Sequence, residues 1–230
     1  MIYAVIAAGG IGSRMGSELP KQYITVGNKP IIAHTVQKFL DIPDFKKVII
    51  LCPEDWCVYT ENLLSEHCPD KRVTVLKGGA DRNETVMNSV RYIESTDGLD
   101  DSTVIVTHDA VRPFVTKEII ERHIESSELY NATGTVIPAT DTIIQSNDGL
   151  TVTGTPDRSK LYQCQTPQTF KAKTLKELYK KLSAEKKAIL TDSCSIFTVS
   201  GESVHLVRGD VQNIKITYPY DLKVAEVILK

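Results

Sequence analysis

The 230-residue sequence carries almost no net charge, because 27 lysines and arginines stand against 29 acidic residues. Binding nucleic acid through counterion release needs a broad basic surface, so this balance argues against a nucleic-acid partner. No apolar stretch approaches the roughly 18 residues of a membrane-spanning helix. The first residues form an apolar run without a charged region before it, which is not typical of a secretory signal. We therefore expect a soluble, cytoplasmic protein with no membrane contact.

Cysteine is sparse and irregularly placed. The five cysteines are an odd number and contain no C-x-x-C pair, so neither a disulfide framework nor metal-ligand spacing is indicated. Cys52 and Cys164 stand in apolar contexts and are expected to be small core residues. Cys194 has no neighbour that would activate a thiolate. A catalytic cysteine is not expected.

Two common nucleotide-binding motifs are also absent. A P-loop requires Gly-Lys followed by Ser or Thr, and this sequence contains no such triplet. The dinucleotide fingerprint G-x-G-x-x-G is not matched, because Gly10, Gly12 and Gly16 are spaced one residue too wide. No acidic residue follows about 20 positions later, where a ribose-binding carboxylate would be needed. Neither of these nucleotide sites is predicted.

A glycine-rich loop nevertheless follows the first apolar run. Residues 2–8 predict a buried strand, and residues 9–16 contain four glycines. Glycine lets backbone N–H groups approach a ligand, and successive inward N–H groups form an anion nest. Arg14 and Lys21 add two positive charges near this loop. The stretch therefore favours a cradle for a polyphosphate, with a purely structural glycine turn as the alternative.

Helix and strand patterns alternate along the chain, which predicts an α/β fold of a single domain over residues 1–230. The expected sheet is mostly parallel with helices on both faces, and its ligand crevice lies outside the carboxyl ends of the strands. The expected strands are 2–8, 48–52, 72–76, 104–106, 134–138, 161–165, 204–207 and 214–216. Helices are expected from Pro30, from Pro53, after Gly79, and over 117–130, 173–182 and 220–229.

The alternation breaks at about residue 140. Residues 143–155 lack a helical period, and Asp148-Gly149 between extended segments is a strong hairpin signal. We expect a protruding β-hairpin arm at about 140–157. An isolated hairpin is barely stable in water, so the arm should pack against something.

A second glycine pair opens a predicted helix at residues 78–85. The backbone of Gly79 and the hydroxyl of Thr85 could read the polar edge of a base. Arg82 could hold the loop or bind phosphates. A helix start that is merely capped by Asp81 explains the same pattern equally well.

An acidic motif, residues 107–114, comes directly after a predicted buried strand. Asp109 could bind Mg²⁺ directly or through water, because Mg²⁺ prefers oxygen ligands. Arg112 could pair with a substrate phosphate in a bidentate manner. The alternative is a structural ion pair between Asp109 and Arg112 at a turn. His108 is not expected to be catalytic, since a phosphate nucleophile needs no general base.

The opening stretch AAGGIGSRMG, closed by LPKQY, resembles the N-terminal motif of cytidylyltransferases that activate sugar-alcohol phosphates. Further stretches resemble the same family in the same order, so the likeness extends over nearly the whole chain. They are GGADRNET at 78–85, THDAVRPF at 107–114, DR at 157–158, QTPQ at 165–168, TD at 191–192 and NIKIT at 213–217.

This resemblance implies a Rossmann-like nucleotidyltransferase fold, Mg²⁺ as cofactor, and a homodimer formed through the arm. It implies that an acceptor phosphate attacks the α-phosphorus of CTP. The implied catalytic cations are Arg14, Lys21, Arg158 and Lys215. The implied nucleotide-binding residues are Ala8, Gly9, Gly10, Gly12, Gly79, Ala80, Arg82 and Thr85. The implied substrate-binding residues are Asp109, Arg112, Thr142, Thr166 and Thr191, with Asp109 as the possible metal ligand.

The acceptor depends on residues 189–198. Enzymes that use methylerythritol phosphate resemble T-D-[DE]-A-S-x-x-E here, whereas this chain has Thr198 in place of the closing glutamate. Enzymes that use ribitol phosphate resemble I-L-T-D-A-C-x-I-F, which residues 189–197 match closely. The sequence favours ribitol 5-phosphate and a CDP-ribitol product for teichoic-acid or capsule synthesis. The alternatives are the methylerythritol-phosphate enzyme of isoprenoid synthesis and a nucleotide-binding module without turnover.

Overall fold

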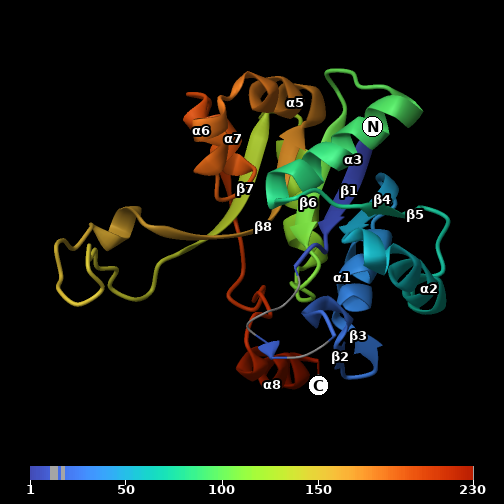
Figure 1. The fold of residues 1–230 in the computed structure, drawn as a ribbon, viewed down its shortest axis with the longest axis horizontal. Coiled ribbons are helices and arrows are strands. Elements are labelled where there is room, and N and C mark those ends of the chain that lie inside the picture. Colours follow the sequence, from blue (N-terminus) through green and yellow to red (C-terminus); the bar gives the residue numbers. More distant parts are fainter. Residues whose placement is uncertain (11–14, 17–18, 230) are drawn as a thin grey trace.

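A central β-sheet organises the protein, and the computed structural model describes residues 1–10, 15–16 and 19–229 (Figure 1). Within these residues the sheet has seven strands in the order β5-β4-β1-β6-β8-β7-β9. Neighbouring strands are parallel except that β8 is antiparallel to both β6 and β7. The strands are β1 (Ile2–Ala7), β4 (Phe45–Cys52), β5 (Val73–Lys77), β6 (Val104–Asp109), β7 (Ala132–Pro138), β8 (Tyr162–Lys171) and β9 (His205–Arg208).

Helices cover both faces of this sheet, which confirms the predicted fold class. Successive side chains of a strand point to opposite faces, and β1 shows this clearly. Ala4 and Ile6 join one apolar cluster, whereas Tyr3 and Val5 join the other. The first cluster includes residues of α1 (Ile31–Leu40), α2 (Cys57–His67) and α4 (Lys117–Ser126). The second includes residues of α3 (Arg82–Asp97), α5 (Ala172–Lys181) and α7 (Cys194–Val199).

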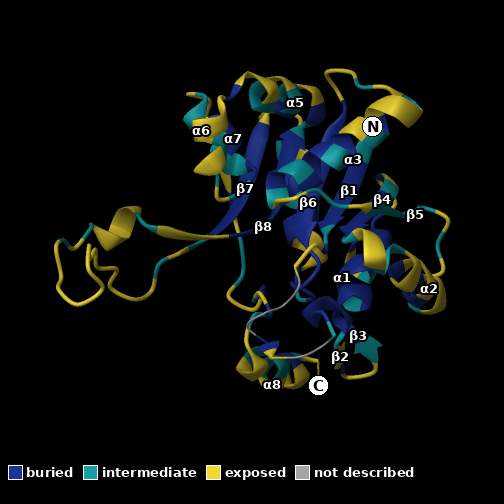
Figure 2. Ribbon diagram, viewed as in Figure 1, coloured by how far each residue is buried: buried dark blue, intermediate teal, exposed yellow. Residues whose placement is uncertain are grey.

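The central strands are buried on both faces, as the dark blue core of Figure 2 shows. Smaller elements complete the chain. They are the 3₁₀ turns η2 (Lys21–Tyr23), η3 (Glu54–Trp56) and η4 (Arg158–Lys160), strands β2 (Thr25–Val26) and β3 (Lys29–Pro30), and helices α6 (Ala184–Ala188) and α8 (Pro219–Ile228). None of the helices in the described parts is long and apolar enough to cross a membrane.

Residues 214–216 are not a strand, contrary to the sequence prediction. They form a loop. Its backbone is joined to the turn after β6 by a hydrogen bond of 2.9 Å from the Ile216 N–H to the Val111 carbonyl. Ile216 is fully buried in a small cluster with Val111 and Ala225 of α8. Its apolar character therefore reflects packing of a loop under α8, which sequence periodicity does not distinguish from a strand.

The prediction for the two core cysteines is half right. Cys52 is fully buried at the end of β4. Cys164 is exposed, because it lies in the first part of β8, where the strand leaves the arm and residues 162–164 are all exposed. The apolar residues around Cys164 in the sequence did not show whether its side chain would be buried.

The arm projects well away from the sheet at the left of Figure 1, between β7 and β8. Its predicted turn is present. The carboxylate of Asp148 accepts hydrogen bonds from the N–H groups of Leu150 and Thr151, both at 2.8 Å. The pairing behind the turn is slight, since Gln145 and Gly154 form an isolated bridge. Ile144, Leu150 and Val152 are exposed.

Candidate active site

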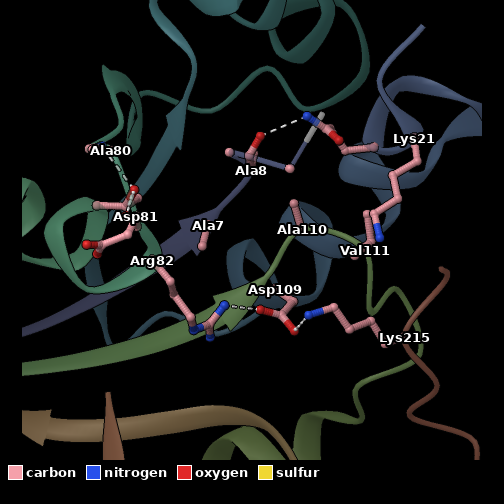
Figure 3. A pocket seen from close by; sticks show the side chains of 15 residues that line it. Ala7, Ala8, Lys21, Ala80, Asp81, Arg82, Asp109, Ala110, Val111 and Lys215 are labelled. Carbon is pink, nitrogen blue, oxygen red and sulfur yellow. Dashed lines mark hydrogen bonds and ion pairs between the residues drawn. The ribbon is translucent and has the colours of Figure 1, made fainter. Parts of the chain in front are cut away.

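A cavity of about 350 Å³ opens at the carboxyl ends of β1 and β6. These strands are parallel neighbours, so the loops that follow them meet at one edge of the sheet. Figure 3 shows the side chains that point into this space. The lining residues are Ala7, Ala8, Gly9, Gly10, Lys21, Gln22, Gly79, Ala80, Asp81, Arg82, Thr85, Asp109, Ala110, Val111 and Lys215.

The first wall of the cavity is the end of β1 and the turn η2. Gln22 is buried, and its side-chain amide donates to the carbonyl of Ala8 at 2.8 Å. Lys21 is 7% exposed, and its ammonium donates to the carbonyl of Ile216 at 3.0 Å. Ala8, Gly9, Gly10 and Lys21 therefore lie together, as predicted. The predicted residues Gly12 and Arg14 lie outside the described residues.

The second wall is the loop that opens α3. The Gly79 N–H donates to the Thr85 hydroxyl at 2.9 Å, and the Ala80 N–H donates to the Glu84 carboxylate at 3.0 Å. Asp81 caps the helix by accepting from the Glu84 N–H at 2.8 Å. A Cβ on Gly79 would lie 2.7 Å from the Glu84 backbone, so only glycine fits there. The loop is thus both a capped helix start and a wall of the cavity.

The floor of the cavity is the carboxylate of Asp109, which contacts three cations. Arg82 forms an ion pair with Oδ1. Lys215 Nζ lies 3.0 Å from Oδ2, and Arg112 Nε lies 3.3 Å from the same oxygen. Figure 3 shows Arg82 and Lys215 reaching Asp109 from opposite sides. These cations come from α3, from the turn after β6, and from the loop before α8.

Asp109 is 5% exposed, and its burial and its charged neighbours shift the pKa of its carboxyl group in opposite directions. Burial by itself would raise the pKa of its carboxyl group. The positive charges of Arg82, Lys215 and Arg112 outweigh burial and hold that pKa well below its ordinary value. The carboxylate is therefore ionised at neutral pH, and three cations surround one anion where a polyanionic ligand would lie.

Three predicted substrate-binding residues do not line the cavity. Arg112 is 9% exposed, and its guanidinium binds Asp109 and the carbonyl of Asn213, so the structural ion pair is what the structure shows. Thr166 is 4% exposed and bonds to the turn beneath Asp109. Thr191 is exposed, just before the short helix α7. The order of motifs in the sequence did not show which of these side chains face the cavity and which face away from it.

Arg158 and Thr142 lie on the arm and not at the cavity of the same chain (Figure 1). Both are exposed, and the guanidinium of Arg158 donates to the carbonyl of Thr140 at 2.9 Å. Within one chain, Arg158 and Thr142 therefore do not lie beside Lys21 and Lys215, which line the cavity. The arm carries them away from the cavity because it projects from the ends of β7 and β8 (Figure 1).

Gln22 and the acidic side chain of Asp81 are lining residues that sequence reasoning did not assign to the site. Gln22 stands inside the LPKQY stretch, so its position next to Lys21 was an available signal. Asp81 was interpreted as a helix cap, which it also is. A residue can cap a helix and border a cavity when the helix begins at the sheet edge.

Glycine loops, a buried carboxylate and converging cations at the carboxyl ends of parallel strands define a nucleotidyltransferase-like α/β protein. The family model for 2-C-methyl-D-erythritol 4-phosphate cytidylyltransferase (IspD) matches residues 2–230. The chain belongs to this family, and it is a cytidylyltransferase.

Solved structures of the family support the same assignment. A 4-diphosphocytidyl-2C-methyl-D-erythritol synthase from Anaerococcus prevotii is 26% identical with a TM-score of 0.81, covering 99% of this chain and 95% of that one. The 2-C-methyl-D-erythritol 4-phosphate cytidylyltransferase of Francisella tularensis is 28% identical with a TM-score of 0.83, covering 98% of each chain. The likeness therefore spans nearly the whole chain.

We predict that Asp109→Asn lowers the free energy of unfolding by about 3 kcal/mol, the low end for breaking a buried ion pair, because three cations lose their counter-ion. The folded-state pKa of Asp109 lies below its unfolded value of about 4. Its stabilisation is therefore complete above that value and is lost as pH falls further. Urea denaturation at several pH values should show the two proteins converging below about pH 4.

The matched control is Asp101→Asn. Asp101 pairs with Lys173 at 2.9 Å on the surface, where such pairs contribute about 0–1 kcal/mol. A loss as small for Asp109→Asn as for this control would contradict the central role of Asp109.

Proposed function

We propose that this chain transfers the cytidylyl group of CTP to the phosphate of a small polyol phosphate and releases pyrophosphate. The observation that carries the proposal is the cavity, where cations from three separate segments meet around Asp109 beside glycine-lined walls. The acceptor phosphate oxygen attacks the α-phosphorus, and the bond to the pyrophosphate oxygen breaks. Both reactants are anions, so catalysis requires alignment and charge neutralisation.

The two lysines that line the cavity suit this task. Lys21 lies beside the glycine-lined end of β1 and would hold the triphosphate and the departing pyrophosphate. Lys215 has a side chain that is 42% exposed, so it can leave Asp109 and reach the α-phosphate. The loop from Gly79 to Thr85 would bind the base, because its backbone lines the opposite wall. Arg82 would stay with Asp109 or turn toward phosphate oxygens.

Magnesium fits this donor set in part. No cluster of three or more histidine, cysteine or acidic side chains forms a metal site within residues 1–10, 15–16 and 19–229. Mg²⁺ is usually bound by one or two carboxylates together with substrate phosphates. Asp109 and Asp81 are the carboxylates that line the cavity. We propose that Asp109 contributes to Mg²⁺ binding, directly or through water, and that the ion neutralises phosphate charge.

Two acceptors have separate support. The family and the Francisella tularensis enzyme are named for 2-C-methyl-D-erythritol 4-phosphate, which favours this acceptor over ribitol phosphate. The stretch 189–197 favours D-ribitol 5-phosphate, and position 198 carries an exposed threonine on α7 in place of a carboxylate. We propose ribitol 5-phosphate as the acceptor, on the basis of residues 189–197 alone. Methylerythritol phosphate is the second candidate, and the comparisons with known proteins support it better.

Pyrophosphate release from CTP and Mg²⁺ with each acceptor in turn tests the choice. We expect the larger kcat/KM with ribitol 5-phosphate. A preference for methylerythritol phosphate would reverse the order of the two candidates. Release with neither acceptor would overturn both and would support a nucleotide-binding module without turnover.

We also propose that the arm completes the site of a second copy. Arg158 and Thr142 were assigned to the acceptor from sequence, yet both belong to the arm, which projects from the sheet of its own chain (Figure 1). The arm exposes Ile144, Leu150 and Val152, which favours burial against another chain. An arm exchanged between two copies in a symmetric dimer satisfies both observations. Sedimentation of the protein should give the mass of a dimer.

A mixing experiment checks the shared site. Arg158→Ala and Lys215→Ala should each be nearly inactive alone. If Arg158 serves the partner's cavity, mixed dimers regain one intact site, and an equimolar refolded mixture should reach about a quarter of wild-type turnover. No recovery, in a mixture shown to exchange subunits, would place both residues in the same site.

We expect Lys21→Ala to lower kcat on the order of 10²–10³-fold, as for loss of one donor that stabilises transition-state charge. Lys21→Met should give the same loss, because it keeps most of the buried aliphatic stem and removes only the charge. Lys173→Ala, on the surface of α5, is the control and should retain full turnover. Near-normal kcat in Lys21→Met would remove Lys21 from the reaction.

A further inference from the structure

A chain of hydrogen bonds lies beneath the turn that carries Asp109. The backbone N–H of Asp109 donates to the Thr166 hydroxyl, with an N–O distance of 3.1 Å. The same hydroxyl lies 3.0 Å from Nδ1 of His108. Nε2 of His108 lies 3.0 Å from the carbonyl oxygen of Arg112. The chain therefore starts and ends on the backbone of one turn, residues 109–112.

A neutral His108 ring satisfies this chain with only one arrangement of protons. A backbone N–H can only donate and a carbonyl oxygen can only accept. Nε2 of His108 must then carry the proton toward Arg112, which leaves Nδ1 as an acceptor. The Thr166 hydroxyl accepts from Asp109 and donates to Nδ1. In its neutral form His108 is thus held in one defined tautomer.

Both side chains are buried beneath the cavity. His108 is fully buried, and its ring lies 5.1 Å from that of Phe39 in the core. Thr166 is 4% exposed, and neither residue lines the cavity. The side chain of Asn213 adds a further clamp by donating to the Thr166 carbonyl at 2.8 Å. The sequence assigned Thr166 to the polyol, whereas its hydroxyl proton is committed to His108.

We propose that His108 and Thr166 are positioning residues, which hold the Asp109 turn so that its carboxylate sets the places of Arg82, Lys215 and Arg112. Three cations depend on the position of this one carboxylate. A misplacement of about 1 Å can lower a rate about 10²-fold when alignment limits the reaction. The proposal rests on cytidylyl transfer and is independent of which polyol phosphate is the acceptor.

Steady-state kinetics of matched variants test this role. Thr166→Val keeps the shape of the side chain and removes the hydroxyl, whereas Thr166→Ser restores it. His108→Phe keeps a ring against Phe39 and removes both hydrogen bonds. We expect kcat to fall about 10²-fold in Thr166→Val and His108→Phe, with the KM for each substrate within about threefold of wild type. Thr166→Ser should recover most of kcat.

The double variant distinguishes one continuous chain of hydrogen bonds from two independent contacts. If the residues act through one chain of bonds, Thr166→Val combined with His108→Phe should be no slower than either single variant. Additive losses would overturn the proposal. So would a large rise in the acceptor KM with kcat unchanged, since that pattern identifies Thr166 as a substrate contact.

Nitrogen NMR of the histidine rings in the full, unliganded protein gives a readout that needs no turnover. We expect His108 to show a protonated Nε2 and an unprotonated Nδ1 at neutral pH. A proton on Nδ1 would overturn the proposal. Absence of turnover with both acceptors would contradict the proposed function. The tautomer of His108 would still test the chain of hydrogen bonds.

Discussion

The structure depends on one buried carboxylate that neutralises three cations. Asp109 lies at the end of a central strand, and its oxygens bind Arg82 of α3, Arg112 of its own turn and Lys215 of the loop before α8. Without this anion, three positive charges would face one another in a partly buried space, which is costly. The same interaction brings distant segments to one edge of the sheet and holds their positive charges at the cavity.

The sheet explains why these segments can meet. Because β4, β1 and β6 are parallel, the loops after residues 7, 52 and 109 open on the same edge. The loop that opens α3 approaches from the neighbouring strand β5, and η2 returns to the end of β1 through the bond between Gln22 and Ala8. The cavity is therefore a property of strand order, and each loop supplies one part of its chemistry.

The sequence predicted much of the fold and part of the site. Alternating apolar runs and helix signals placed the strands, because burial on both faces leaves a continuous apolar pattern. Gly79, Lys21 and Asp109 were placed in the cavity, since they follow strands or open helices. Arg112 and Thr166 were assigned as substrate contacts, and neither lines the cavity. Arg158 and Thr142 are on the arm, and the loop at 214–216 was mistaken for a strand.

The sequence by itself determined the class of fold, the family and the charged residues available for catalysis, because these follow from local patterns and the order of motifs. Only the tertiary structure decided which cations converge, which are committed to Asp109 and which stand on the arm. Those outcomes depend on contacts between residues such as Lys215 and Asp109, which lie about a hundred positions apart in the chain. Strand order and packing determine such contacts, and neither can be read from the spacing of motifs.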